Sequence, residues 1–462
     1  MSSEVAGIIL AAGKGTRMKS DTPKVLHEIS GVPMVETVVR AMRSAGVTRI
    51  VIVIGHGAEL VRARMGDGFE YAVQDPPMGT GDAVRVGMAP LQDFEGSVLV
   101  SAGDTPLLTG DALARLVHAQ QSEALGASIA TVELENPYGY GRVLFEGDQF
   151  DGIVEEKDAT PEQKRLREVC VSVDGFDARA LREALPKLTN ENAQGEYYLT
   201  DVPLLMAKAG HGVKTVKYDD PTIFSGVNDR AQLADAQAVL RARINRQHLL
   251  NGVTMIDPSS TYIGLDVEIG NDTILFPNCV LEGKTRIGQR CVLGPAARVV
   301  NSVIGNDVRV VTSSIADSTV GDDAKIGPWA TLRDRAVIQN RAKVGNYVEV
   351  KNSTLGEKAS AAHLAYIGDA DVGSYANIGA GTITANYDGF TKSRTVVGDR
   401  VFIGSNSTLV APVTIGDGAF VVAGSVITHP VPDNAGAFGR ARQENKPDWA
   451  EKYRARKQGN PS

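Results

Sequence analysis

The chain has 462 residues, 43% of them hydrophobic and 22% charged, which suits two or three soluble domains and disfavours a disordered or membrane-embedded protein. Its 55 acidic and 48 basic side chains give a net charge of -7, so no general electrostatic attraction to nucleic acid or anionic membranes is expected. Glycine is in surplus, at 49 residues against a norm of ~7%, whereas aromatic residues make up only 5%.

The cysteines and the N-terminal residues indicate the compartment. Cys170, Cys279 and Cys291 cannot all pair, and no Cys-x-x-Cys or Cys/His cluster has the spacing of a zinc site. The apolar run at residues 5–12 is too short to span a membrane, and acidic Glu4 rather than a basic segment precedes it. We therefore expect a cytoplasmic protein with small-molecule substrates, no nucleic-acid partner and no membrane insertion.

The first half of the chain alternates aliphatic runs with amphipathic stretches. Residues 5–10, 50–54 and 98–100 predict strands, and residues 35–42 predict a helix. This alternation is typical of a Rossmann-like α/β domain with a parallel sheet covered on both faces. Ligands in such sheets bind at the carboxyl ends of the strands.

A long helix is expected between the two halves. Apolar residues recur at near-helical spacing over residues 229–251, and Asn251-Gly252 forms a stop signal. We therefore predict an α/β domain at 1–228, a helical linker at 229–250, a repeat domain at 251–437 and a basic tail at 438–462.

The repeat domain is predicted from aliphatic residues that recur every six positions. Three frames carry this period: 263 to 299, 326 to 350 and 403 to 427. Neither helical nor strand periodicity produces a period of six, and glycine often follows the aliphatic residue, as in Ile263-Gly264. The pattern resembles the hexapeptide-repeat left-handed β-helix, in which three hexads form each triangular coil. That implies about ten coils.

Two further segments stand out in the second half. Residues 384–400 interrupt the repeat, and such insertions leave a solenoid as loops that often carry function. The tail after Phe438 carries seven basic and three acidic side chains, and a solvated tail is one interpretation of this excess of +4.

The turn after the first predicted strand has the composition of a phosphate cradle. It reads Leu10-Ala-Ala-Gly-Lys-Gly-Thr-Arg-Met18, and Pro23-Lys24 follows. Glycines let backbone N–H groups approach phosphate, while Arg17 and Lys24 supply positive charge. The spacing fits neither a P-loop nor the dinucleotide fingerprint.

With this turn, the chain resembles sugar-1-phosphate nucleotidyltransferases. Joined to the hexapeptide repeats and to the stretch 188–201, the resemblance becomes specific for the bifunctional N-acetylglucosamine-1-phosphate uridylyltransferase/glucosamine-1-phosphate acetyltransferases. It covers residues 5 to about 440. It implies two reactions: acetyl-CoA-dependent acetylation of glucosamine-1-phosphate, then Mg²⁺-dependent uridylyl transfer from UTP.

The resemblance also implies residues for uridylyl transfer, with Arg17 and Lys24 as the catalytic cations. The residues that it implies for UTP are Leu10, Ala11, Ala12, Gly13, Lys24, Gln74, Gly79 and Thr80. Gly103 and Asp104 are implied as further substrate-binding residues. Asp104 and Asn228 match the magnesium ligands, and oxygen donors of this kind suit Mg²⁺.

The sugar-binding positions match less completely. Gly141 and Glu155 fit family positions for the N-acetylglucosamine moiety. The family usually has Asn-Thr/Ala-Gly where this chain reads Cys170-Val171-Ser172, so a thiol replaces an amide. Losing one hydrogen bond costs about 0.5–1.5 kcal/mol, and we expect Cys170→Asn to lower the KM for the sugar phosphate.

The acetyltransfer site is implied around His363, the general base, since imidazole titrates near neutral pH. The substrate ligands implied are Arg333, Lys351, Tyr366, Asn377 and Asn386. The acetyl-CoA contacts implied are Ala380, Asn386, Tyr387, Ser405, Ala423 and Arg440. The family is trimeric through the β-helix, so a homotrimer is implied.

Two alternatives stay open at this point. The first half could serve another sugar-1-phosphate, as Cys170 permits, with a separate acyltransferase half. The chain could also be a non-catalytic regulatory subunit with the same two domain types. The intact charge sets around Lys24 and His363 argue against the second alternative.

Overall fold

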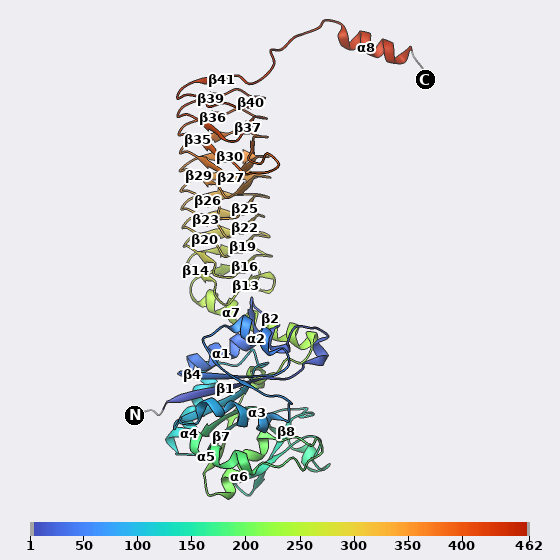
Figure 1. Ribbon diagram of the computed structural model, residues 1–462, viewed down its shortest axis with the longest axis vertical. Helices are drawn as coiled ribbons and strands as arrows, with labels where there is room; N and C mark the ends of the chain where they lie inside the picture. The colour runs from blue at the N-terminus through green and yellow to red at the C-terminus, as the bar shows by residue number, and fades with distance from the viewer. Residues whose placement is uncertain (1–3, 460–462) are drawn as a thin grey trace. The chain divides into compact units, whose positions relative to one another are not determined.

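The computed structural model describes residues 4–459, which form two compact units that divide between residues 243 and 244 (Figure 1). The unit boundary falls inside helix α7 (Arg230–Leu250), which the sequence predicts as a linker at 229–250. No helix among the described residues is long and apolar enough to cross a membrane.

The first unit is built on a nine-stranded sheet in which the order β11-β7-β10-β6-β1-β4-β5 forms the main path. Its strands are β1 (Val5–Ala11), β4 (Arg49–Ile54), β5 (Glu70–Val73), β6 (Ser97–Ala102), β7 (Ala127–Glu133), β8 (Gly141–Glu146), β9 (Gln149–Val154), β10 (Glu168–Asp177) and β11 (Val213–Tyr218). A short hairpin of β2 (Glu28–Ile29) and β3 (Val32–Pro33) precedes the first helix.

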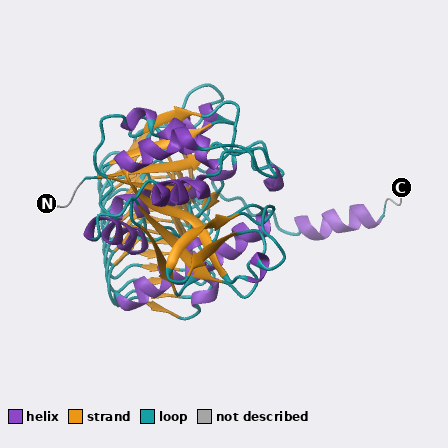
Figure 2. Ribbon diagram, turned by 90° about the horizontal axis from the view of Figure 1, so that it is seen from below, coloured by secondary structure: helices purple, strands orange, loops and turns teal. Residues whose placement is uncertain are grey.

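Helices pack around this sheet, as the purple and orange elements of Figure 2 show. They are α1 (Met34–Ser44), α2 (Ala58–Met65), α3 (Thr80–Gly87), α4 (Gly110–Ser122), α5 (Ala178–Ala184) and α6 (Val202–Lys208). Two buried apolar clusters result, one with α1 and α4 and the other with α3, α5 and α6. The prediction of a sheet covered on both faces is confirmed.

The prediction of a parallel sheet is right for the centre and wrong for its continuation. Strand β1 runs parallel to β4 and β6, but β10 runs antiparallel to β6 and β7. The antiparallel direction places the first half of β10 beside the carboxyl end of β6, where Val173 pairs with Ser101. Residues around 170–174 therefore reach the edge at which β1, β4 and β6 end.

The second unit is a left-handed parallel β-helix whose short strands stack into three sheets of eleven, ten and nine strands (Figure 1). The coils have room for one inward aliphatic side chain per strand, and the residues of the three predicted frames, such as Leu281, Leu332 and Ile403, are almost all buried. The predicted six-residue period is thus confirmed as the period of the core.

The three sheets have the following members. The first contains β12 (Thr254–Met255), β15 (Ile274–Leu275), β18 (Val292–Leu293), β21 (Arg309–Val310), β24 (Lys325–Ile326), β27 (Lys343–Asn346), β30 (Ser360–His363), β33 (Asn377–Ile378), β36 (Phe402–Ile403), β39 (Phe420–Val421) and β41 (Gly436–Ala437). The second contains β13 (Tyr262–Ile263), β16 (Val280–Glu282), β19 (Arg298–Val300), β22 (Ser314–Ala316), β25 (Thr331–Arg333), β28 (Glu349–Lys351), β31 (Tyr366–Gly368), β34 (Ile383–Ala385), β37 (Thr408–Val410) and β40 (Val426–Ile427). The third contains β14 (Glu268–Ile269), β17 (Arg286–Ile287), β20 (Val303–Ile304), β23 (Thr319–Val320), β26 (Val337–Ile338), β29 (Thr354–Leu355), β32 (Ala370–Val372), β35 (Thr395–Val397) and β38 (Val413–Ile415).

Glycine is required where consecutive coils touch. A Cβ on Gly404 would lie 2.3 Å from the backbone nitrogen of Ala423 in the next coil. This contact accounts for part of the glycine surplus. After β41 the chain continues to helix α8 (Trp449–Gln458), none of whose residues is buried.

Candidate functional site

The glycine-rich turn lies at the end of β1 and packs directly on Lys24. Gly15 has a φ of 57°, and a Cβ there would meet the Cβ of Lys24 at 2.5 Å. Glycine adopts this left-handed conformation without strain, and its lack of a Cβ leaves the space that Lys24 fills. The turn therefore fixes Lys24, while Arg17 stays exposed on the short 3₁₀ helix at Thr16–Met18.

Lys24 joins the two predicted magnesium ligands. Its Nζ donates a hydrogen bond to the Asp104 carboxylate and a second one, at 3.1 Å, to Asn228 Oδ1. The side chains of Lys24 and Asp104 are only 15% and 16% exposed. The backbone N–H of Val227 donates to the Asp104 carbonyl at 2.8 Å, which holds Asn228 beside Asp104.

The oxygens around Lys24 Nζ have the chemistry of a magnesium site. Asp104 and Asn228 both accept hydrogen bonds from the Lys24 ammonium group. Their side-chain oxygens therefore lie close enough together to bind one cation. Mg²⁺ is commonly held by one or two protein oxygens together with substrate phosphates and water. Among the described residues, no group of three or more His, Cys, Asp or Glu side chains is arranged to hold a metal ion, so a more complete protein cage of such ligands is absent there.

Several of the residues predicted to bind the nucleotide line a pocket that opens beside the turn. Its walls include Leu10, Ala12, Gly13, Gln74, Pro77, Gly79, Thr80, Ala83 and Glu196. Gln74 is buried, and its amide nitrogen donates to the Gly79 carbonyl at 3.0 Å and to Asp82 at 2.8 Å. With both amide hydrogens used, the carbonyl oxygen of Gln74 is the group available to a base.

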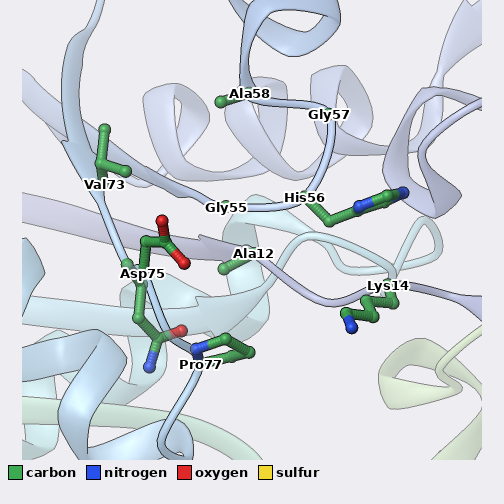
Figure 3. A pocket seen from close by; sticks show the side chains of 10 residues that line it. Ala12, Lys14, Gly55, His56, Gly57, Ala58, Val73, Asp75 and Pro77 are labelled. Atoms are coloured by element: carbon green, nitrogen blue, oxygen red, sulfur yellow. The ribbon is translucent and has the colours of Figure 1, made fainter.

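A second pocket extends from the same turn and shares Ala12, Gln74 and Pro77 with the first. Figure 3 shows Lys14 and His56 on one side of this pocket and Asp75 on the other. Sequence reasoning missed His56 and Asp75, because each is a lone polar residue in a loop that only the parallel sheet brings to the turn.

One predicted sugar position, Glu155, lies at a third pocket, which shares Leu10, Thr80 and Glu196 with the first pocket beside the turn. Glu155 lines it and accepts a hydrogen bond from the Thr200 hydroxyl at 2.9 Å. Burial raises the pKa of Glu155 despite that hydrogen bond. A Cβ on Gly141 would lie 3.6 Å from the Glu155 carboxylate, so Gly141 contacts it closely.

Cys170 is not among the described residues that line this pocket. Its thiol is buried against Ile129 and Val143, and burial raises its pKa. The pairing of β10 with β7 shifts register between residues 170 and 174, with Ser172 at a φ of 53°. This irregularity brings Ser172 and Asp174, which sequence reasoning did not select, to the pocket wall.

In the second unit, Lys351 and Asn386 meet at a buried carboxylate that sequence reasoning also missed. Asp369 accepts hydrogen bonds from Asn386 and, at 2.5 Å, from Asn352, and it lies 3.9 Å from Lys351 Nζ. Burial alone would raise the pKa of Asp369, but the two amide hydrogen bonds and the attraction of Lys351 outweigh it and hold the pKa low. Asp369 thus orients two predicted ligands.

Arg333 lies directly below Lys351, because these residues pair in adjacent strands β25 and β28. Its guanidinium pairs with Glu349 at 2.7 Å, and Glu349 is in turn aligned with Tyr366 on β31. Arg333, Lys351 and Tyr366 are therefore held on one sheet of the β-helix, as two cations and a phenol suited to an anionic ligand.

His363 and three predicted acetyl-CoA residues form a column on successive coils. Ala361, Ile378, Ile403 and Val421 are aligned in register, and the residues two positions after them are His363, Ala380, Ser405 and Ala423. His363 is exposed at the end of β30, three residues before Tyr366 at the start of β31.

The remaining predicted residues flank this column. Asn377 is aligned with Ser360 on the neighbouring coil, and the Arg440 side chain lies beside Gly424. Tyr387 is exposed in the loop that leaves the solenoid after β34, where its hydroxyl donates to the Gly389 carbonyl at 2.6 Å. This loop lies within the insertion predicted at 384–400.

Comparison with known proteins gives matches to both halves. The model for the MobA-like NTP transferase domain matches residues 7–194, and the model for the bacterial transferase hexapeptide (six repeats) matches residues 394–429. The chain is 45% identical to the bifunctional protein GlmU of Acetivibrio thermocellus, with 96% of each chain covered. It is 47% identical to the bifunctional protein GlmU of Streptococcus agalactiae serotype V, covering 96% of this chain and 97% of the relative. It is also 47% identical to that of Caldanaerobacter subterraneus subsp. tengcongensis, covering 97% and 98%.

Proposed function

Because this chain belongs to the family of bifunctional GlmU proteins, it is a bifunctional transferase of UDP-N-acetylglucosamine synthesis, and we propose that the residues described above carry its two reactions. One reaction acetylates glucosamine-1-phosphate, and the other transfers a uridylyl group to N-acetylglucosamine-1-phosphate. Family membership also favours the enzyme over a non-catalytic regulatory subunit.

For uridylyl transfer, the observation that supports the assignment is the convergence of Lys24, Asp104 and Asn228 beside the glycine-rich turn. A phosphate oxygen of the sugar phosphate attacks the α-phosphorus of UTP, the α–β P–O bond breaks, and pyrophosphate leaves. Lys24 and Arg17 stabilise the charge of the transferring group, and Gln74 accepts a hydrogen bond from the base. Bound Mg²⁺, held by Asp104 and Asn228, would neutralise phosphate charge.

For acetyl transfer, the supporting observation is that Asp369 holds Lys351 and Asn386 together. Arg333, Lys351 and Tyr366 bind the sugar phosphate. The neutral amine attacks the thioester carbonyl of acetyl-CoA and His363 accepts the amine proton. The carbon–sulfur bond then breaks, and the CoA thiolate takes up this proton and leaves as the thiol. The column of Ala380, Ser405 and Ala423, with Tyr387 and Arg440, contacts acetyl-CoA, and the backbone at Ala380 is the candidate oxyanion donor.

A homotrimer in the cytoplasm completes the proposal. Large apolar side chains that stay exposed on the β-helix support self-association: Trp329 stacks on Tyr347 at 5.3 Å, and Leu364 beside His363 is also exposed. We expect light scattering of the purified chain to give three times the monomer mass. A monomeric mass with full acetyl transfer would contradict the trimer.

The two sites are tested by following pyrophosphate and thiol release separately. The purified chain receives UTP, Mg²⁺ and N-acetylglucosamine-1-phosphate in one assay, and acetyl-CoA with glucosamine-1-phosphate in the other. Asp104→Ala should abolish only pyrophosphate release, and His363→Ala only thiol release. Loss of both activities from either substitution would contradict two independent sites.

A further inference from the structure

The wall of the sugar pocket contains a buried carboxyl group, one oxygen of which has no partner among the described residues. Asp174 on β10 is 3% exposed, and its Oδ1 has no hydrogen-bond partner among the residues that the structure describes. Its neighbours on the flanking strands are Val100 and Ile129, which offer no side-chain donor. Buried polar groups are normally paired, so an unpaired carboxyl at a pocket wall points to a ligand.

The pocket around Asp174 suits an uncharged polar molecule. Leu10, Ala102, Leu199 and the ring of Tyr198 supply apolar surface, whereas Ser172 and Thr200 supply hydroxyls. Its lining residues include three carboxylates but no Lys, Arg or His. These carboxylates would therefore repel an anionic group of a ligand inside the pocket. The hydroxyl or acetamido groups of a sugar ring would instead find hydrogen-bond partners there.

We propose that Asp174 is a sugar-binding residue of the uridylyltransferase site, which hydrogen-bonds a polar substituent of the sugar ring from the pocket wall and so contributes to the choice of sugar. This inference rests on the assignment of the pocket to the sugar. The thiol of Cys170, four residues earlier on β10, packs into an apolar cluster instead. The polar contacts from this strand therefore come from Ser172 and Asp174, and only Asp174 supplies a carboxyl group.

The surroundings of Asp174 favour a neutral carboxylic acid that donates its proton to a sugar oxygen. The titratable groups that face the pocket are Glu155, Glu196 and Tyr198, and those next to it are Asp158, Asp201, the Cys170 thiol and Arg142; all but Arg142 are acids. The nearby Arg142 is committed to Glu156 at 2.7 Å. Burial raises the pKa of Asp174 to about 7. A bound sugar removes more water and favours the acid further.

The experiment compares Asp174→Leu, which removes the polar group, with Asp174→Asn, which keeps a hydrogen-bond donor but cannot titrate. Asp151→Asn, an exposed aspartate on strand β9 of the same sheet, is the matched control. The KM for N-acetylglucosamine-1-phosphate and the KM for UTP are measured from pH 6 to 8.5, with acetyl transfer and thermal unfolding as checks of folding.

Asp174→Leu should raise the sugar-phosphate KM at least about fivefold and leave the UTP KM within about twofold. The wild-type sugar KM should rise above pH 7, because Asp174 ionises there and loses its donor proton. The rise is measured relative to Asp174→Asn in the same buffers, since titration of the substrates affects both proteins equally. An unchanged sugar KM in Asp174→Leu, or equal rises in both KM values, would overturn the proposal. If the wild-type chain itself releases no pyrophosphate, that result would instead refute the assigned reaction.

Discussion

Replacing Asp369 by asparagine tests whether this carboxylate orients the acetyltransfer site. The side chain is 10% exposed and accepts hydrogen bonds from Asn352 and Asn386 beside Lys351. An asparagine can accept only one of these bonds well, because its own NH₂ faces the second donor. One charge-assisted hydrogen bond is then lost and a buried donor is unpaired, which costs about 2–4 kcal/mol.

This loss should appear in acetyl transfer, because Asn386 and Lys351 lose their common anchor. Since about 1.4 kcal/mol corresponds to a factor of ten, we expect kcat/KM for glucosamine-1-phosphate to fall at least about 30-fold. The control is Asp371→Asn, whose exposed pair with Arg394 contributes about 0–1 kcal/mol, so its effect should stay below about fivefold. Thiol release measures both variants, and pyrophosphate release should not change. A rate for Asp369→Asn within about threefold of wild type would refute the reasoning.

Three further substitutions and one pH series test the first unit. Gly15→Ala should lower uridylyl transfer at least about tenfold, because its Cβ meets Lys24 at 2.5 Å and φ is positive; an unchanged rate would show that the turn does not position Lys24. Lys24→Met should lower pyrophosphate release at least about 100-fold without affecting thiol release. Cys170→Asn, which the sequence alone predicts to lower the sugar KM, places an amide in an apolar cluster, so calorimetry should show a lower melting temperature. In a pH series, Asp174→Asn should be more stable than wild type at pH 8, and the difference should shrink as pH falls through about 7. The pKa of Asp174 is higher in the folded wild-type protein than in the unfolded chain. The folded protein therefore binds a proton as pH falls through about 7, and the free energy of unfolding of wild type rises.

The second unit could be predicted from the sequence in more detail than the first. A coil of the β-helix repeats one local rule, an aliphatic residue every six positions, so Leu281, Leu332 and Ile403 were identifiable without any knowledge of distant contacts. The sheet of the first unit depends on strand order instead. No local pattern near Cys170 shows that β10 runs antiparallel to β6, and this direction decides which of its residues reach the pocket.

The residues that sequence reasoning missed share a physical cause. Nothing in the local sequence around Asp369 or Asp174 distinguishes them from other aspartates. Asp369 acquires its role from two amides and an ammonium group that surround it in space, and Asp174 from the lack of a partner for its Oδ1 among the described residues. A motif identifies residue types that chemistry needs at a fixed spacing. The environment of a carboxylate depends on residues far along the chain, here from Val100 to Thr200 around Asp174, and only the fold assembles it. An unpaired buried carboxyl destabilises the free protein, so its presence in the sugar pocket is best explained by a bound partner.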